Sequence, residues 1–271
     1  MSSSHNPRFS LGDDLTLAHR LADAADAITL KRFQANDLTV TTKPDNTPVT
    51  DADKSSEEAI RALLHAHRPD DGIVGEEFGN EGVEKNRYWV IDAIDGTKNF
   101  LRGVPTWATL IGLVERSEDG SQKTIVSVVS APALFRRWYA HRGGGAFVTI
   151  NRETTKKLQV SGVSKIEDAS ISYSDFHGWG DALQPFEALL KKAWRTRGYG
   201  DFWSHMLVAE GSVDVAIEPV LALWDMVALD LIVTEAGGTF SNTAGVAGPH
   251  GGNGLSTNGV LHSYIVDALR K

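Results

Sequence analysis

The sequence contains no cysteine among its 271 residues. This absence excludes disulfide bonds, zinc–thiolate sites, iron–sulfur clusters and thiol nucleophiles. Three familiar catalytic patterns are missing as well: the sequence has no His-Glu-x-x-His zinc motif, no P-loop and no Gly-x-Ser-x-Gly nucleophile elbow. Any catalysis must therefore use oxygen or nitrogen groups in another arrangement.

Positive charge is also scarce. The chain has 27 Lys and Arg residues against 35 Asp and Glu residues, so its formal net charge at pH 7 is −8. A protein that binds nucleic acid needs a basic face to release counterions from the phosphates, so we expect no nucleic-acid partner. If the substrate carries phosphate, a group other than the side chains must supply much of the positive charge.

Long apolar runs are the third absence. The longest uninterrupted apolar stretches, such as Ala108 to Val114, are far shorter than the roughly 20 residues of a membrane-spanning helix. The polar first ten residues lack the apolar segment of a signal peptide. With 41% hydrophobic and 23% charged residues, the composition is that of a globular protein. We therefore expect a soluble, cytoplasmic protein without a membrane partner.

The periodicity of the apolar residues predicts an α/β fold. After a polar tail at residues 1–12, helical spacing predicts a helix from Asp13 to about Gln34 and a second one after the turn-rich segment 42–50. Several later strands follow one another without a helix between them, so we expect mixed sheets. We expect one domain of two packed halves, about residues 13–150 and 151–271. The predicted strands are Gly72–Glu76, Tyr88–Ile94, Thr106–Val114, Thr124–Ser130, Arg137–His141, Ala169–Ser174 and Val213–Ile217, and the later helices are Leu183–Trp194, Phe202–Glu210 and Trp224–Ala236.

The strongest local signal is a pair of aspartates in the stretch Trp89-Val-Ile-Asp92-Ala-Ile-Asp95-Gly96-Thr97. Two ionised carboxylates at a buried strand end repel each other and lose hydration unless a cation neutralises them, so a bound metal explains them economically. Strict alternation points residues i and i+3 to opposite faces, so the strand must turn before Asp95 for both to converge. An ordinary Asp-Gly turn without a metal is the alternative interpretation.

Three further acids occur at predicted strand or helix ends. Glu76 and Glu77 follow the preceding strand, and Asp225 opens a late helix. Taken singly, each has an ordinary interpretation, as a solvated loop carboxylate or as an anion at a helix start. Together with Asp92 and Asp95 they form a set without His or Cys, and all-oxygen ligation fits Mg²⁺ or Mn²⁺ and disfavours zinc, copper and haem iron.

These residues resemble the inositol monophosphatase superfamily of Mg²⁺-dependent phosphatases. The resemblance is carried by Gly75-Glu76-Glu77, Trp89–Phe100, Trp224-Asp225 and Glu235–Gly238, and it covers nearly the whole chain. Other stretches are most similar to the histidinol-phosphate phosphatases of this superfamily: Lys43–Asp53, Arg102–Trp107, Ser130–Leu134 with Arg136–Trp138, and Tyr199–Phe202. The resemblance implies a layered αβαβα fold, a homo-oligomer (commonly a dimer), and two to three Mg²⁺ ions per site, with Mn²⁺ as a substitute.

The resemblance also implies roles for individual residues. Thr97 and Glu76 position and deprotonate the attacking water, and Asp53 partners the threonine. The implied metal ligands are Glu76, Asp92, the Ile94 carbonyl, Asp95, Asp225 and Asp53. The implied substrate-binding residues are Gly96, Thr97, Trp107, Arg197, Gly200, Asp201 and Glu218. Ala93 departs from the family, which usually has proline there, and this change costs stiffness of the turn more than chemistry.

The implied activity is hydrolysis of a phosphate monoester, and the implied substrate is histidinol phosphate, an intermediate of histidine biosynthesis. This small molecule carries an ammonium and an imidazole. Asp201 and Glu218 offer a cation two carboxylates, and the rings of Trp107 and Phe202 are candidates to lie against the imidazole. Packing in the core is the alternative role for Trp107.

Other functions remain open on the sequence alone. An inositol monophosphatase, a broad sugar-phosphate phosphatase or a nucleotide-bisphosphate phosphatase would use the same metal site. In a different class, the chain would be an inactive metal-binding regulatory scaffold. The presence of Thr97, Glu76 and every expected carboxylate favours an enzyme.

Overall fold

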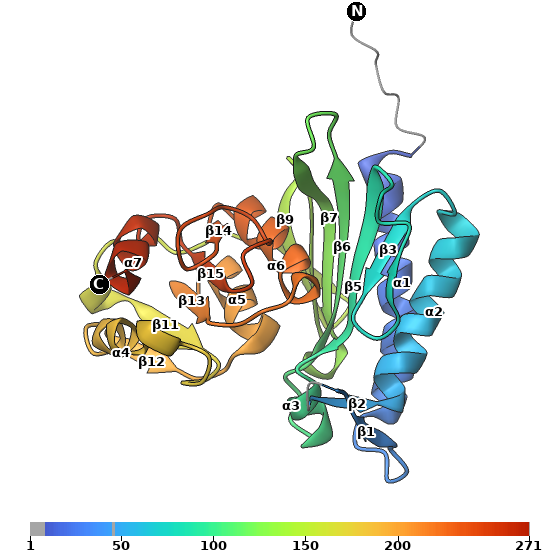
Figure 1. The fold of residues 1–271 in the computed structure, drawn as a ribbon, viewed down its shortest axis with the longest axis horizontal. Helices are drawn as coiled ribbons and strands as arrows, with labels where there is room; N and C mark the ends of the chain where they lie inside the picture. Colours follow the sequence, from blue (N-terminus) through green and yellow to red (C-terminus); the bar gives the residue numbers. More distant parts are fainter. Residues whose placement is uncertain (1–8, 45–46, 271) are drawn as a thin grey trace, which may run out of the picture.

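The computed structural model describes residues 9–44 and 47–270 and contains two large sheets, with helices between and outside them, and one two-stranded sheet (Figure 1). Five layers follow one another across the molecule, helices alternating with sheets. The helical layers are α1 (Leu11–Arg32) with α2 (Asp51–His67), then α5 (Asp201–Ala209) with α6 (Leu223–Glu235), then α4 (Leu183–Leu190) with α7 (His262–Leu269). The predicted α/β sandwich is thus confirmed.

The larger sheet has eight strands in the order β10-β9-β8-β7-β6-β5-β3-β4. Only its β3–β5 pair is parallel, and every other neighbouring pair is antiparallel. The strands are β3 (Gly72–Gly75), β4 (Gly79–Glu81), β5 (Arg87–Asp95), β6 (Ala108–Arg116), β7 (Gln122–Ala131), β8 (Arg136–His141), β9 (Gly145–Ile150) and β10 (Thr154–Lys157).

The smaller sheet has five strands in the order β12-β11-β13-β15-β14. Its β11–β12 and β11–β13 pairs are parallel and the other two pairs are antiparallel, so both sheets are mixed, as predicted. Its strands are β11 (Ser170–Tyr173), β12 (Arg195–Arg197), β13 (Val215–Glu218), β14 (Thr239–Ser241) and β15 (Gly254–Thr257). A separate hairpin, β1 (Val40–Thr42) and β2 (Pro48–Thr50), precedes α2.

Some predicted boundaries are wrong. Helix α1 begins at Leu11, two residues early, because Ser10 and Asp13 form a capping box that satisfies the first backbone N–H groups. The predicted tail therefore ends sooner than residue 12, and its first eight residues lie outside those described. Helix α4 ends at Leu190 rather than Trp194. The strands β9 and β10 were not predicted; β10 is exposed along its whole length and lacks the apolar alternation that predicts a strand.

Helix α6 is fixed tightly against the larger sheet. It packs on β5, β6 and β7, and its Met226, Leu229 and Ile232 are buried between the two sheets. A Cβ added at Gly112 of β6 would lie 2.4 Å from Val227 Cγ1, so the glycine permits the close approach of helix and strand. This contact places the first turn of α6 beside the end of β5.

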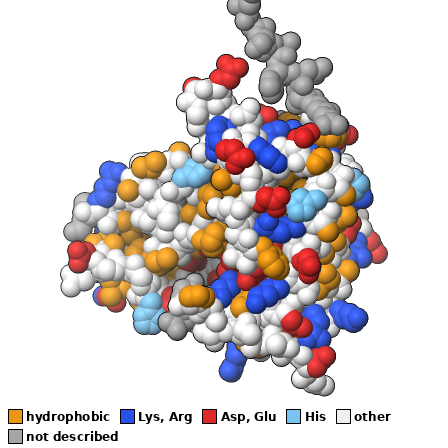
Figure 2. Space-filling model, turned by 45° about the vertical axis from the view of Figure 1, so that its right-hand side comes forward, with side chains coloured by type: hydrophobic (Ala, Val, Ile, Leu, Met, Phe, Trp, Pro, Cys, Tyr) orange, Lys and Arg blue, Asp and Glu red, His pale blue; other side chains and the backbone are white. Residues whose placement is uncertain are grey.

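Charges of both signs lie on the face of the molecule that Figure 2 shows. On the face shown in Figure 2, Lys and Arg side chains are interspersed with Asp and Glu rather than gathered in one basic patch. Among the described residues, no helix combines the length and the apolar character that a membrane span requires.

Candidate active site

Three acidic residues converge where β5 ends. Asp92 pairs with Leu110 of β6 while Asp95 pairs with Ala108, so the register shifts between the two aspartates. This bulge turns both side chains to one side, and Asp225 of α6 approaches them from the other half of the chain. One carboxylate oxygen from each of the three lies within 4.8 Å of the others. The structure thus brings together three of the predicted metal ligands.

Each of these carboxylates is oriented by one backbone N–H group. Ile94 N donates to Asp92 Oδ1 (3.0 Å), Phe202 N donates to Asp95 Oδ2 (2.7 Å), and Ala222 N donates to Asp225 Oδ2 (2.7 Å). The three donors come from β5, the start of α5 and the residue before α6. Segments distant in the sequence therefore fix one small group of oxygen atoms.

Burial disfavours the ionised form of all three carboxylates. It raises the pKa of Asp92 and Asp95 well above the ordinary value, and neighbouring acids raise both further. Burial raises the pKa of Asp225 to about 7, again with help from nearby carboxylates. Within the described residues no Lys or Arg forms an ion pair with any of the three. An all-oxygen, anionic and buried donor set of this kind fits a hard divalent cation.

Glu76 lies beside this group but is paired with a lysine. Strand β3 runs parallel to β5 with Gly75 opposite Ile91, which places the following Glu76 near Asp92. Lys43 Nζ lies 2.7 Å from Glu76 Oε1 and 2.6 Å from Glu77 Oε1. Burial opposes the charge on Lys43, but the two carboxylates outweigh it and raise the pKa of the ammonium. Sequence reasoning assigned Lys43 no role, although the residue begins one of the resembling stretches.

Thr97 and Asp53 form the second part of the site. Thr50 caps α2, and its N–H and O–H groups donate to Asp53 Oδ2. The other oxygen, Asp53 Oδ1, lies 3.4 Å from Thr97 Oγ1, which is also 3.1 Å from the Ile94 carbonyl oxygen. Burial raises the pKa of Asp53. The same capping box that starts the helix therefore orients the partner of the threonine.

The turn between Asp95 and α3 (Thr97–Leu101) requires glycine. Gly96 has a φ of +82°, and a Cβ there would lie 2.9 Å from the Thr106 carbonyl oxygen. Across from it, Gly200 has a φ of +71°, and Asp201 has a left-handed φ of +52°. Asp201 Oδ2 accepts a hydrogen bond from Asn99 Nδ2 (3.1 Å), so Asn99 joins the start of α5 to α3.

Glu218 ends β13 and is almost fully buried, with 2% of its surface exposed. The Ser174 hydroxyl donates to its Oε2, while Oε1 has no hydrogen-bond partner among the described residues. Burial raises the pKa of Glu218 to about 8, and the charges of Asp201 and Asp225 contribute. Ser174 was not predicted as a site residue, because its proximity to Glu218 arises only from the pairing of β11 with β13.

Three residues predicted to contact the substrate, Trp107, Phe202 and Arg197, have the following surroundings. Trp107 is fully buried with Phe33 and Phe100, an aromatic cluster that favours its packing role. Phe202 is 1% exposed and packs near Trp138. Arg197 is exposed on the edge strand β12, where its guanidinium donates to the Thr196 carbonyl. The backbone N–H group of Phe202 nevertheless contacts the site, through its hydrogen bond to Asp95.

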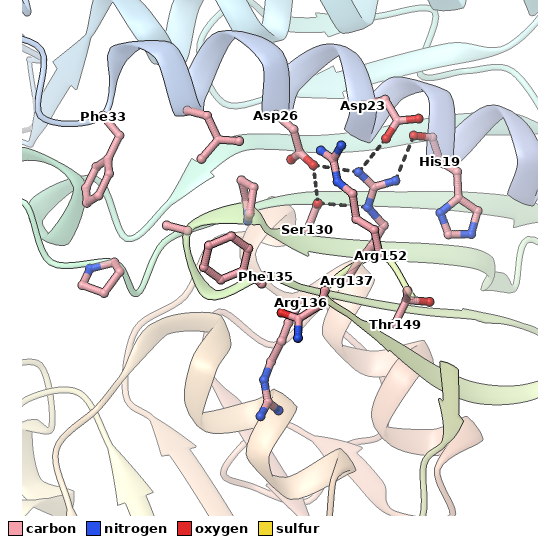
Figure 3. Close-up of a pocket in the computed structure, with 15 residues that line it drawn as sticks. His19, Asp23, Asp26, Phe33, Ser130, Phe135, Arg136, Arg137, Thr149 and Arg152 are labelled. Carbon is pink, nitrogen blue, oxygen red and sulfur yellow. Dashed lines mark hydrogen bonds and ion pairs between the residues drawn. The ribbon is translucent and has the colours of Figure 1, made fainter. Parts of the chain in front are cut away.

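A separate groove of about 1090 Å³ lies between α1 and the β7–β8 end of the larger sheet (Figure 3). Its buried acid, Asp26, has a cationic partner: Arg137 Nη2 donates to Asp26 Oδ2 (2.7 Å) and to Asp23 Oδ1 (2.8 Å). Arg137 Nε donates to Ser130 Oγ (3.0 Å). Because Asp23 and Asp26 both pair with Arg137, this groove differs from the β5 site, whose three aspartates have no cationic partner among the described residues.

The chain is similar to known proteins over nearly its whole length. Residues 12–271 match the inositol monophosphatase family. A histidinol-phosphatase from Streptomyces coelicolor is 55% identical over 96% of this chain and 97% of its own length, and one from Mycobacterium tuberculosis is 51% identical over 95% and 98%. Among solved structures, the extragenic suppressor protein suhB from Bartonella henselae superposes with a TM-score of 0.84 at 27% identity, over 95% of this chain and 98% of that one.

We predict that Asp92→Asn prevents tight Mg²⁺ binding. The substitution keeps the side-chain volume but removes one charge from the centre of the carboxylate group, so the dissociation constant for Mg²⁺ should rise at least 100-fold in a calorimetric titration. Asp119→Asn, in the exposed turn after β6, makes the same chemical change away from the site and should bind as the wild type does. Unchanged affinity in the Asp92 variant would contradict the metal assignment.

Proposed function

The chain belongs to the inositol monophosphatase family, and on that premise we propose that it is a Mg²⁺-dependent phosphatase that converts histidinol phosphate and water to histidinol and phosphate. The observation that carries the proposal is the group of three carboxylates at the end of β5, beside Thr97, that have no cationic partner among the described residues. The substrate is supported by the histidinol-phosphatases that share more than half of their residues with this chain. Such a reaction belongs to histidine biosynthesis.

Two to three Mg²⁺ ions are part of the proposal, in keeping with the Mg²⁺ dependence of the family. Glu76, Asp92, Asp95, Asp225 and the Ile94 carbonyl would hold them. Bound Mg²⁺ supplies the positive charge that the phosphoryl oxygens and the departing alkoxide need, and that a protein of net charge −8 otherwise lacks. Lys43 pairs with Glu76 Oε1, so Glu76 Oε2 would be the oxygen that serves as the ligand.

Thr97 and Asp53 position the attacking water and accept its proton. Thr97 Oγ1 can donate its hydrogen to Asp53 Oδ1, and its lone pair then accepts a hydrogen bond from the water. Asp53 keeps its orientation throughout because Thr50 holds its second oxygen. The pair therefore positions the water and gives its proton a path toward a buried carboxylate whose pKa is already raised.

The phosphoryl group would lie at the start of α3. The first backbone N–H groups of a helix have no partner within the helix, and here they belong to the Gly96-Thr97 turn next to the carboxylates. A side chain at position 96 would collide with the Thr106 carbonyl, so glycine leaves these groups accessible. Backbone donors and metal charge together permit an acidic protein to bind an anionic ester.

The alcohol portion of the substrate would meet Glu218 and Asp201. Glu218 Oε1 has no partner among the described residues, and an unpaired buried carboxylate oxygen favours a cationic group such as the ammonium of histidinol. Ser174 and Asn99 hold the two acids in place. Inositol and sugar phosphates carry no ammonium, so they lack the group that would compensate this charge.

Homo-oligomerisation is also part of the proposal. Leu30 and Phe135 expose 43% and 68% of their surface at the groove beside α1, and apolar surface of this kind favours contact between copies of the chain. Light scattering coupled to size-exclusion chromatography should give a mass of at least twice 29.4 kDa. A mass of one chain at all concentrations would contradict this part.

We predict that the protein releases phosphate from histidinol phosphate with a kcat/KM at least 100-fold higher than from inositol 1-phosphate. Activity should require Mg²⁺ and disappear with a chelator, because the carboxylates alone repel the substrate. A phosphate-release assay with both substrates, with and without Mg²⁺, measures this. The opposite preference would favour an inositol phosphatase, and no release from any phosphate ester would favour a non-catalytic scaffold.

We further predict that Glu218→Gln lowers kcat/KM for histidinol phosphate by at least tenfold, because the neutral amide no longer compensates the ammonium. The same variant should hydrolyse glycerol phosphate, which has no cationic group, within about threefold of the wild-type rate. Parallel kinetics on the two substrates separate recognition from general damage to the site. An equal loss on both substrates, or none on either, would contradict the proposed contact.

A further inference from the structure

A row of polar side chains runs along one face of α2. Asp53, Glu57, Arg61 and His65 are spaced four residues apart and therefore lie on the same face of the helix. Asp53 faces Thr97, and the next three contact the segment from Glu77 to Glu81. This segment directly follows Glu76. One helix face thus contacts both the residues beside the threonine and the turn that carries Glu76.

Glu57 is the central member of this row and has no exposed surface. Its Oε2 accepts a hydrogen bond from Glu77 N (2.8 Å), and its Oε1 accepts one from Phe78 N (3.2 Å). Arg61 Nε donates to the same Oε1 (2.8 Å), and the Arg61 guanidinium also donates to the Gly79 carbonyl. A single buried carboxylate therefore binds the two N–H groups that come immediately after Glu76, and its charge is compensated by Arg61.

Gly75, the residue before Glu76, leaves room for the Glu57 carboxylate. A Cβ at Gly75 would lie 2.0 Å from Glu57 Oε1 and 2.5 Å from its Cδ, so only glycine leaves room for the carboxylate. The Glu76 N–H group donates to the Ile91 carbonyl of β5 (3.3 Å). The backbone of Glu76 is thus held by β5 on one side and by Glu57 on the other, with little freedom to rotate away from Asp92.

We propose that Glu57 is a positioning residue for Glu76: it fixes the turn after β3 so that the Glu76 carboxylate is directed at the Asp92 group. The proposal rests on the metal-ligand role of Glu76 in the proposed function. Glu57 is not itself a ligand, since both of its oxygens bind protein donors. Residues that orient the ligands of a metal in this way typically change its affinity by 10- to 100-fold.

The test is Mg²⁺ titration by calorimetry on the wild type, Glu57→Gln and Glu58→Gln. Glutamine at position 57 has one acceptor oxygen, so it can bind only one of the two N–H groups well and its amide N–H₂ opposes the other. The dissociation constant for Mg²⁺ should rise at least tenfold. Glu58 is the exposed neighbour on the same helix, and its variant makes the same charge change without that loss, so its affinity should stay within twofold of the wild type.

Kinetics on histidinol phosphate provide a second readout. For Glu57→Gln, the Mg²⁺ concentration giving half-maximal activity should rise with the dissociation constant, while KM for the substrate at saturating Mg²⁺ stays within about threefold of the wild type. A merely structural role would lower the amount of folded enzyme and leave both values unchanged.

Gly75→Ala tests the same contact from the other side. This substitution keeps every charge but displaces the Glu57 carboxylate, so it should also raise the Mg²⁺ dissociation constant at least tenfold. If Glu57→Gln does not fold, the Gly75→Ala protein tests the positioning role instead. Wild-type Mg²⁺ affinity in a folded Glu57→Gln or Gly75→Ala protein would overturn the positioning role. Absence of Mg²⁺ binding in the wild type would instead overturn the proposed function.

Discussion

The main constraint on the structure is the closeness of three carboxylates, those of Asp92, Asp95 and Asp225, that have no cationic partner among the described residues. If two of them are ionised at separations of at most 4.8 Å, they repel each other by about 3 kcal/mol or more at an effective dielectric constant of 20, before the loss of hydration is counted. The fold tolerates this cost through one backbone N–H group per carboxylate, supplied by β5, by the start of α5 and by the residue before α6. The five-layer architecture is the framework that holds these three donors in place.

One face of helix α2 contacts two parts of the site, Thr97 and the turn after Glu76. Its first turn orients Asp53 through the cap at Thr50, and its next turn holds the backbone after Glu76 through Glu57. Both contacts follow from the same four-residue spacing, so the distance between the threonine and the Glu76 turn is set by the rise of a regular helix. This explains how a site built on loops and strand ends reaches a fixed geometry.

The sequence predicted the site best where the signal is local. Asp92 and Asp95 stand at the end of an apolar strand, and without cysteine or a cluster of histidines the predicted ligands were oxygen atoms. Glu57 gave no such signal, because a glutamate in an amphipathic helix is typical of a solvated face until the β3–β4 segment is placed against it. Ser174 and Asn99 likewise acquire their partners only through sheet pairing and the docking of α5. For Trp107 the sequence left two roles open, stacking against the substrate or packing in the core, because a tryptophan beside an acidic motif is compatible with both.

The approach of Asp225 from α6 has a consequence for the assembly of the chain. Asp92 and Asp95 belong to the larger sheet and Glu76 directly follows its strand β3, whereas Asp225 belongs to the helical layer that joins this sheet to the smaller one. A divalent ion held by all of them would act as a noncovalent crosslink between segments more than 100 residues apart in the sequence. Because only the docked arrangement offers the full set of ligands, ion binding would favour closure of the two layers, and the folding equilibrium of the chain would shift with the free Mg²⁺ concentration.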